Sequence, residues 1–88
     1  MTRPRFGLYL CGAEQPRNLL VRKRLEALLE ELYPQGIELA VVDIQNDPAA
    51  AETVGILAAP TLIRHWPDPE LRIIGDFADA ASIRLLLE

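Results

Sequence analysis

Apolar residues along this chain of 88 residues are spaced first as in a strand and then as in a helix. The run from Phe6 to Leu10 is mostly apolar and too short for a helix, so it predicts a buried strand. From Arg17 to Tyr33 the apolar residues recur every three or four positions, which predicts an amphipathic helix. The apolar stripe of this helix consists of Val21, Leu25, Leu28, Leu29 and Leu32.

The ends of this helix are marked by residues that favour helix termini. Either Asn18 or the Gln15-Pro16 pair can begin it, because asparagine caps helices and proline is tolerated in the first turn. Pro34 and Gly36 end it. The chain therefore opens with a strand, a loop through Gly12 and a long helix.

A second strand and a short helix follow. The segment from Glu38 to Ile44 is rich in aliphatic and β-branched residues, which is typical of a central parallel strand. Asp47 then precedes Pro48, and this pair predicts a helix that is capped by the aspartate and continues from Ala49 to Thr53.

Two further strands are separated by a proline-rich turn. We expect strands from Thr61 to Arg64 and from Leu71 to Ile74, with a turn at Pro67-Asp68-Pro69. Because the connection is so short, the two strands must form an antiparallel hairpin.

The last predicted element is a helix from Ala80 to Leu87, with Asp79 as its cap. Gly75-Asp76 ends the strand before it. The order strand, helix, strand, helix, strand, strand, helix predicts an α/β protein with a thioredoxin-like fold. With 88 residues and no internal repeat, we expect a single domain spanning residues 1–88.

Pro60 lies at the start of the third predicted strand. Proline cannot donate to a sheet ladder, so it must precede the strand, and tight loops of this kind are where cis proline bonds occur. We therefore expect a cis Ala59-Pro60 bond, in a loop that faces the end of the first strand.

Composition fits a globular protein, with 50% hydrophobic and 25% charged residues. No apolar run reaches the roughly 18 residues that span a bilayer, and the N-terminal segment leads into a strand pattern rather than a signal peptide. We expect a cytoplasmic protein without membrane contact. One cysteine fits a reducing compartment and excludes an internal disulfide.

The net charge of −4 is unevenly distributed. Residues 1–24 carry +5, whereas residues 25–88 carry −9. The basic residues are not interleaved with stacking aromatic residues, so we do not expect nucleic-acid binding. An acidic patch on a protein partner fits Arg22-Lys23-Arg24 better, although a solvated helix face is the alternative.

Cys11 raises the question of redox chemistry, because it ends the first strand near the expected cis-proline loop. Dithiol chemistry needs a second thiol, which the chain does not have. A monothiol mechanism with glutathione stays open. The favoured interpretation is a small buried hydrophobic residue, because the segment from Gly12 to Arg17 separates Cys11 from the helix.

Other catalytic patterns are weaker. His65 is the only histidine and has no partner at a triad or metal spacing, so we expect it on the surface of the hairpin. Asp43, Asp47, Asp76 and Asp79 occupy turn and cap positions. No phosphate-binding loop is present either, and we expect a binding module without a metal or cofactor rather than an enzyme.

Several segments together resemble the KaiB family of the bacterial circadian oscillator, from about Phe6 to Leu87. The proline-loop motif is general among thioredoxin-like proteins, but the Ile-Ile-Gly-Asp run at the matching distance makes the resemblance more specific. The matching segments are Leu8-Tyr9-Leu10-Cys11-Gly12, Val42-Asp43-Ile44 with Asn46 and Pro48, Ile56-Leu57-Ala58-Ala59-Pro60-Thr61-Leu62, and Arg72-Ile73-Ile74-Gly75-Asp76.

This resemblance implies a protein that works by docking on a KaiC-type ATPase and that recruits or displaces KaiA or the histidine kinases SasA and CikA. It also implies two folds, a rearranged tetramer and a thioredoxin-like monomer that binds partners. The implied contacts lie on the first helix and the second strand, which the resemblance makes a partner-facing edge. They are Arg22, Lys23, Glu38 and Ala40, with Gly12 and Asn18 as loop contacts, and the implied fold-switch region comprises Pro67, Pro69, Gly75 and Asp76.

The chain also departs from the family pattern. Pro67-Asp68-Pro69 stands where consecutive prolines are common, and Ala40 stands where clock members tend to have a basic residue. An adaptor that works with a histidine kinase or in a stress response, without a clock, is therefore an alternative function. Because the segment from Ala80 to Leu87 favours helix, we expect a monomer at rest, with the tetramer as the alternative.

Overall fold

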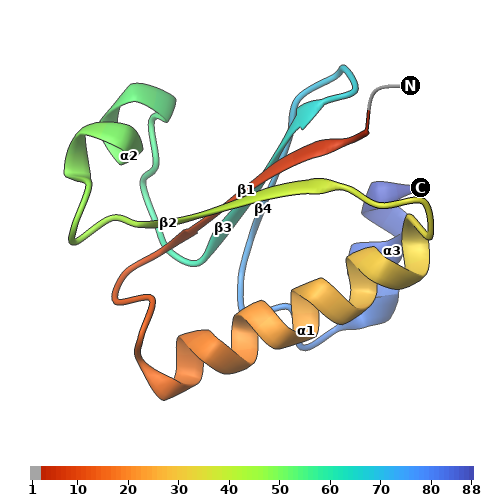
Figure 1. Ribbon diagram of the computed structural model, residues 1–88, viewed down its shortest axis with the longest axis horizontal. Helices are drawn as coiled ribbons and strands as arrows, with labels where there is room; N and C mark the ends of the chain where they lie inside the picture. Colours follow the sequence, from red (N-terminus) through yellow and green to blue (C-terminus); the bar gives the residue numbers. More distant parts are fainter. Residues whose placement is uncertain (1–2) are drawn as a thin grey trace.

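The computed structural model describes residues 3–88 and is organised around strand β1 (Arg5–Leu10), which pairs with a neighbour on each side. Strand β2 (Glu38–Asp43) runs parallel to β1, and β3 (Thr61–Trp66) runs antiparallel to it. Strand β4 (Leu71–Ile74) completes the hairpin with β3. The sheet order is β2-β1-β3-β4 (Figure 1).

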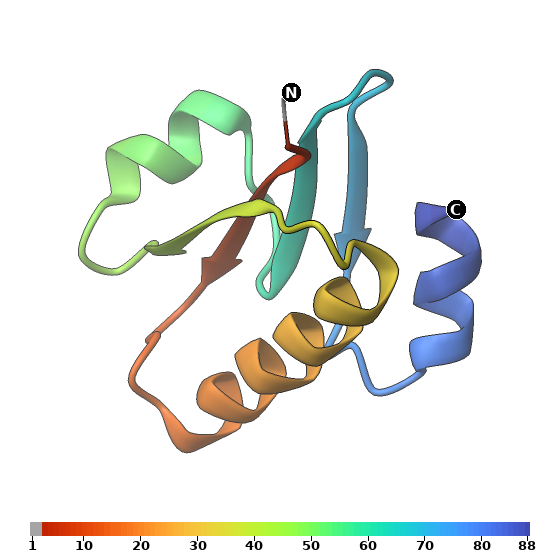
Figure 2. The same cartoon turned by 45° about the vertical axis from the view of Figure 1, so that its right-hand side comes forward.

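Three helices cover the two faces of this sheet. Helix α1 (Pro16–Leu32) and helix α3 (Ala80–Leu87) lie side by side on one face, whereas α2 (Pro48–Val54) lies on the other (Figures 1 and 2). The predicted element order and the α/β thioredoxin-like architecture are confirmed, with ends that differ by at most two residues. Among residues 3–88, no helix has both the length and the hydropathy to cross a bilayer.

Strand β2 is an edge strand, so the residue pattern that predicted a central strand was wrong, and the edge implied by the family resemblance is confirmed. Leu39 and Val41 pack against the core beneath α1. Glu38 and Ala40, which alternate with them, are exposed. One face of β2 is thus partly buried against the core, whereas Glu38 and Ala40 on the other face are exposed.

The main core lies between the sheet and the pair α1 and α3. Leu8 and Leu25 have no exposed surface, and Phe77 and Leu87 close the core from the C-terminal side. The rings of Phe6 and Tyr33 pack at 5.8 Å between centroids and 54° between planes, an ordinary tilted aromatic pair.

The helix starts follow local chemistry. The Asp47 carboxylate accepts a hydrogen bond from the Ala50 backbone N–H at 3.1 Å, and the Asp79 carboxylate accepts one from the Ser82 N–H at 3.2 Å, so both predicted caps are confirmed. Helix α1 begins with Gln15 as the cap residue and Pro16 in its first turn, and not at Asn18.

The expected cis Ala59-Pro60 bond is confirmed. The bonds before Pro67 and Pro69, in the turn between β3 and β4, are also cis, which the sequence did not indicate.

Candidate docking surface

The loop that joins β1 to α1 is held by the carboxylate of Asp43 at the end of β2. Asp43 Oδ1 accepts hydrogen bonds from the backbone N–H groups of Gly12 at 3.1 Å and Gln45 at 3.0 Å, and Oδ2 accepts one from Ala13 at 2.9 Å. These three N–H donors lower the pKa of Asp43, and the N–H of Ala13 has the largest effect. Desolvation of the carboxylate opposes this change. The carboxylate therefore joins the ends of two adjacent strands.

Asn18 holds the same loop from the other side. Its amide Nδ2 donates to the carbonyl oxygens of Cys11 at 3.0 Å and Gly12 at 2.8 Å, and the residue is only 5% exposed. Gly12 is buried and has a φ of +85°, and an added Cβ would lie 2.8 Å from Cγ of Gln15. Asn18 and Gly12 therefore shape the loop from inside, and direct contact of either with a partner stays a prediction.

Cys11 is exposed, so its interpretation as a small buried hydrophobic residue was wrong. Asn18 binds the Cys11 carbonyl and Asp43 binds the Gly12 N–H that follows it, and the Cys11 side chain stays outside the core. Gln45 Nε2 lies 3.5 Å from Cys11 Sγ as a weak donor. The thiol and Pro60 line the same groove, as the sequence predicted when it placed the cis-proline loop opposite the end of β1.

The other four predicted contact residues are exposed. Arg22 and Lys23 lie on α1, where Arg22 Nε pairs with Glu26 Oε1 at 3.4 Å, and Lys23 has no ion pair within residues 3–88. Glu38 lies opposite Arg5, and Ala40 lies opposite Gly7, both on the free edge of β2. The four residues therefore lie on two elements, Arg22 and Lys23 on α1 and Glu38 and Ala40 on the face of β2 that points away from α1.

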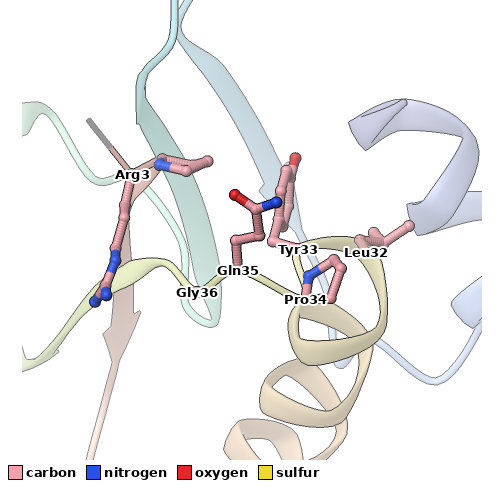
Figure 3. A pocket seen from close by; sticks show the side chains of 7 residues that line it. Arg3, Leu32, Tyr33, Pro34, Gln35 and Gly36 are labelled. Carbon is pink, nitrogen blue, oxygen red and sulfur yellow. The ribbon is translucent and has the colours of Figure 1, made fainter. Parts of the chain in front are cut away.

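A second hollow lies at the far end of α1. It has a volume of about 490 Å³ and is lined by Arg3, Tyr33 and Gly36 among others (Figure 3). Tyr33 has structural partners, because its ring packs on Phe6 and its hydroxyl donates to the Leu87 carbonyl at 3.4 Å. In Figure 3 the Arg3 guanidinium points away from the Tyr33 ring.

No metal site is formed by the part of the chain that the structure describes, because no three histidine, cysteine or carboxylate side chains come together there. His65 lies in β3 of the hairpin, as predicted, and is half-buried there. Its Nδ1 lies 4.0 Å from Glu70 Oε1, and its Nε2 would lie 3.1 Å from a Cβ on Gly7. This arrangement packs the side chain against the sheet.

Comparison with known proteins identifies the family. The model of the KaiB domain matches residues 8–88. The chain belongs to the KaiB family. It is 36% identical over 81 residues to the circadian clock oscillator protein KaiB of Microcystis aeruginosa (strain NIES-843 / IAM M-2473), covering 92% of this chain and 77% of that one.

Solved structures support the fold of this KaiB-family chain. The N-terminal domain of Synechococcus elongatus SasA superimposes with a TM-score of 0.78 at 18% identity, over 97% of this chain and 81% of that one. Fasciola hepatica thioredoxin gives 0.70 at 23% identity, over 94% of this chain and 76% of that one. At these identities the likeness concerns the fold alone.

The residues expected to form the KaiB-type fold-switch region lie at the two ends of the β3–β4 hairpin. Pro67 and Pro69 are in the turn between the strands. At the other end the Gly75 N–H donates to the Pro60 carbonyl at 3.1 Å, and Asp76 lies 4.0 Å from the Arg24 guanidinium. The structure therefore connects Gly75 to the cis-proline loop and separates it from the other two prolines.

Two contacts were missed by the sequence analysis. Asp43 had been interpreted as a turn residue, yet it holds the loop after β1. The available signal was its place at the end of a parallel strand, because such ends meet at one edge of a sheet. The pairing of Arg24 with Asp76 had no local signal, since 52 positions separate them.

Proposed function

We propose that this KaiB-family chain is a clock-related regulatory protein that acts by docking on a KaiC-type ATPase, and not as an enzyme. The observation that carries this proposal is the family match over residues 8–88, together with relatives that are named as circadian clock oscillator proteins. We propose further that residues 1–88 form a single domain, that the protein is cytoplasmic and that it works without a cofactor.

The exposed surface of α1 and β2 supports docking physically. The unpaired edge of β2 presents backbone donors and acceptors to solvent. Lys23, on the solvent side of α1, offers a positive charge without an ion pair inside residues 3–88. A partner with an acidic patch would gain both main-chain contacts and charge complementarity at this surface.

We also propose that the resting state is a monomer in the thioredoxin-like form. The segment from Ala80 to Leu87 is a regular helix with its Asp79 cap in place, and Ile83 and Leu87 are buried against the core. A second fold would have to replace these contacts within a few kcal/mol. An elution volume and scattered intensity that correspond to a tetramer would contradict the monomer.

Size-exclusion chromatography with light scattering tests the proposal, first with the protein alone and then with a phosphorylated KaiC-type ATPase. We expect a monomer that joins the ATPase ring. Replacing Lys23→Ala should weaken the complex about twofold to fivefold, because a charge at an interface rim contributes up to about 1 kcal/mol. The exposed control Ala49→Glu, on α2, changes the net charge equally and should have no effect. Absence of any complex would contradict ATPase docking.

A histidine-kinase adaptor is the alternative within the same family. If the ATPase does not bind, the same measurement is repeated with KaiA and with a SasA-type or CikA-type kinase. This shows whether one of these proteins is the partner instead. A complex with a kinase alone would favour the adaptor without a clock.

A second candidate function, monothiol redox chemistry, is favoured by the exposure of Cys11 beside Pro60. The alkylation rate of Cys11 tests it. A rate no faster than that of the same thiol in the urea-unfolded chain would exclude this candidate, whereas faster labelling and a mixed disulfide with glutathione would support it.

A further inference from the structure

A groove of about 370 Å³ runs between the first half of α1 and the loop that leads into β3. Its apolar lining comes from Leu20 and Val21 on α1 and from Ala59 and Pro60 on the loop. This groove differs from the proposed docking surface, because none of Arg22, Lys23, Glu38 and Ala40 lines it, and of the predicted contacts only the loop contact Asn18 does.

One large apolar side chain that lines the groove is left exposed. Leu20 is 48% exposed, and the half-buried Ala59 and Pro60 line the groove with it. A leucine gains roughly 1.5–3 kcal/mol when it is fully buried, so a partner that covers Leu20 would bind with a favourable hydrophobic contribution.

The charges in the groove are predominantly positive. Arg24 is partly neutralised, because its Nη1 donates to the Asp76 carbonyl at 3.3 Å and lies 4.0 Å from the Asp76 carboxylate. Arg17 has no ion pair among the described residues 3–88. An occupant that carries carboxylates would therefore complement the groove, whereas a basic one would be repelled.

Both walls of the groove are fixed before anything binds. Asn18 and Asp43 hold the loop that carries Cys11, and the Pro60 carbonyl accepts a hydrogen bond from Gly75 at 3.1 Å. A preformed site loses less conformational entropy on binding than a mobile one.

We propose that this groove binds a short acidic segment of a protein partner, with one apolar side chain against Leu20 and Pro60 and a carboxylate beside Arg17. It forms a second interaction surface, on the opposite flank of α1 from Arg22, and goes beyond the docking proposed above. The mode is an extended segment in a preformed groove, in which the apolar residue gives affinity and the charge gives specificity.

The single thiol provides the assay, because Cys11 lines the groove and is the only cysteine in the chain. The alkylation rate of Cys11 by iodoacetamide is measured in the folded protein with increasing amounts of a glutamate-rich peptide that has one central leucine. We expect saturable slowing of alkylation. The same peptide with serine in place of leucine, and the same peptide with lysines in place of glutamates, should protect Cys11 much less.

Two neighbouring leucines supply matched variants. Leu20→Glu places a charge in the groove and should lower peptide affinity about tenfold, the equivalent of roughly 1.4 kcal/mol. Leu19→Glu is the control, because Leu19 is 49% exposed on the same helix but does not line the groove. The affinity of the Leu19→Glu variant for the peptide should stay within about twofold of that of the parent protein.

Four outcomes would overturn the proposal. The first two are alkylation of Cys11 that is not slowed at millimolar peptide, and equal protection of Cys11 by the lysine peptide. The third is an equal loss of peptide affinity in both leucine variants. The fourth is alkylation that becomes slower at higher protein concentration when no peptide is present. The last result would show that a second copy of this chain fills the groove.

Discussion

Asn18, on the first turn of α1, is expected to stabilise the loop after β1. Replacing Asn18→Ala removes both hydrogen bonds from Nδ2, to the carbonyls of Cys11 and Gly12. A hydrogen bond contributes about 1 kcal/mol net, and an acceptor left buried without a donor costs about 1–3 kcal/mol. The Gly12 carbonyl keeps the Gln15 N–H as a donor at 3.0 Å, so only the loss of one hydrogen bond applies there, and the larger cost applies to the partly buried Cys11 carbonyl.

Alanine also brings a small gain, because its helix propensity exceeds that of asparagine by about 0.5 kcal/mol. The expected net loss is about 2 kcal/mol in the free energy of unfolding. For a chain of 88 residues, with an unfolding entropy of about 2.1 cal/mol/K per residue, this corresponds to a decrease in Tm of about 10 °C.

Urea unfolding followed by circular dichroism measures this loss, and thermal unfolding checks it. The control is Asn46→Ala, because Asn46 is exposed and its replacement should change the free energy of unfolding by less than about 0.5 kcal/mol. If Asn18→Ala and Asn46→Ala had the same small effect, the two hydrogen bonds would not stabilise the loop and the reasoning would be refuted.

Three further predictions concern the core, the sheet and the pH dependence. Leu25→Ala should lower the free energy of unfolding by about 2–5 kcal/mol, because Leu25 is fully buried, whereas Leu85→Ala on the exposed side of α3 should change it by less than about 0.5 kcal/mol; urea titration of both compares them. Gly7→Ala should cost about 1–3 kcal/mol in the same assay, because the new Cβ would lie 2.8 Å from Cε1 of the buried Tyr9, and an unchanged midpoint would contradict this. The pKa of Asp43 is lowered in the folded protein, so its stabilisation is complete above the ordinary value of 3.8 and is lost as pH falls through the lowered pKa. Asp43→Asn should therefore be less stable than the parent near neutral pH, and the difference should shrink in acid, as urea midpoints across pH would show.

The sequence predicted the elements well because their signals are local. The three-and-four spacing in α1, the caps Asp47 and Asp79, and the proline before β3 all act within a few residues of one another. Each of these elements was found, with small differences at its ends. The residue pattern of β2 led to the wrong prediction of a central strand, because aliphatic residues occur both in central strands and in edge strands with one buried face.

The candidate site was only partly predictable from the sequence, since its geometry depends on residues far apart in the chain. The sequence proposed exposure of Arg22 and Lys23, and the structure agrees. It placed Cys11 inside, whereas the bonds from Asn18 and Asp43 hold the surrounding backbone with the thiol outside.

Spacing, caps and prolines determined the order of elements and the cis bond at Pro60, and short sequence motifs carried the resemblance to the family, because each of these signals lies within a few neighbouring residues. Only the tertiary structure decided which strand forms the edge, which polar side chains turn inward, and that a groove separates α1 from the cis-proline loop. The physical reason is that burial and hydrogen-bond partners depend on contacts across the sheet. Asp43 meets Gly12 across 31 positions and Arg24 meets Asp76 across 52, and no local pattern encodes such contacts.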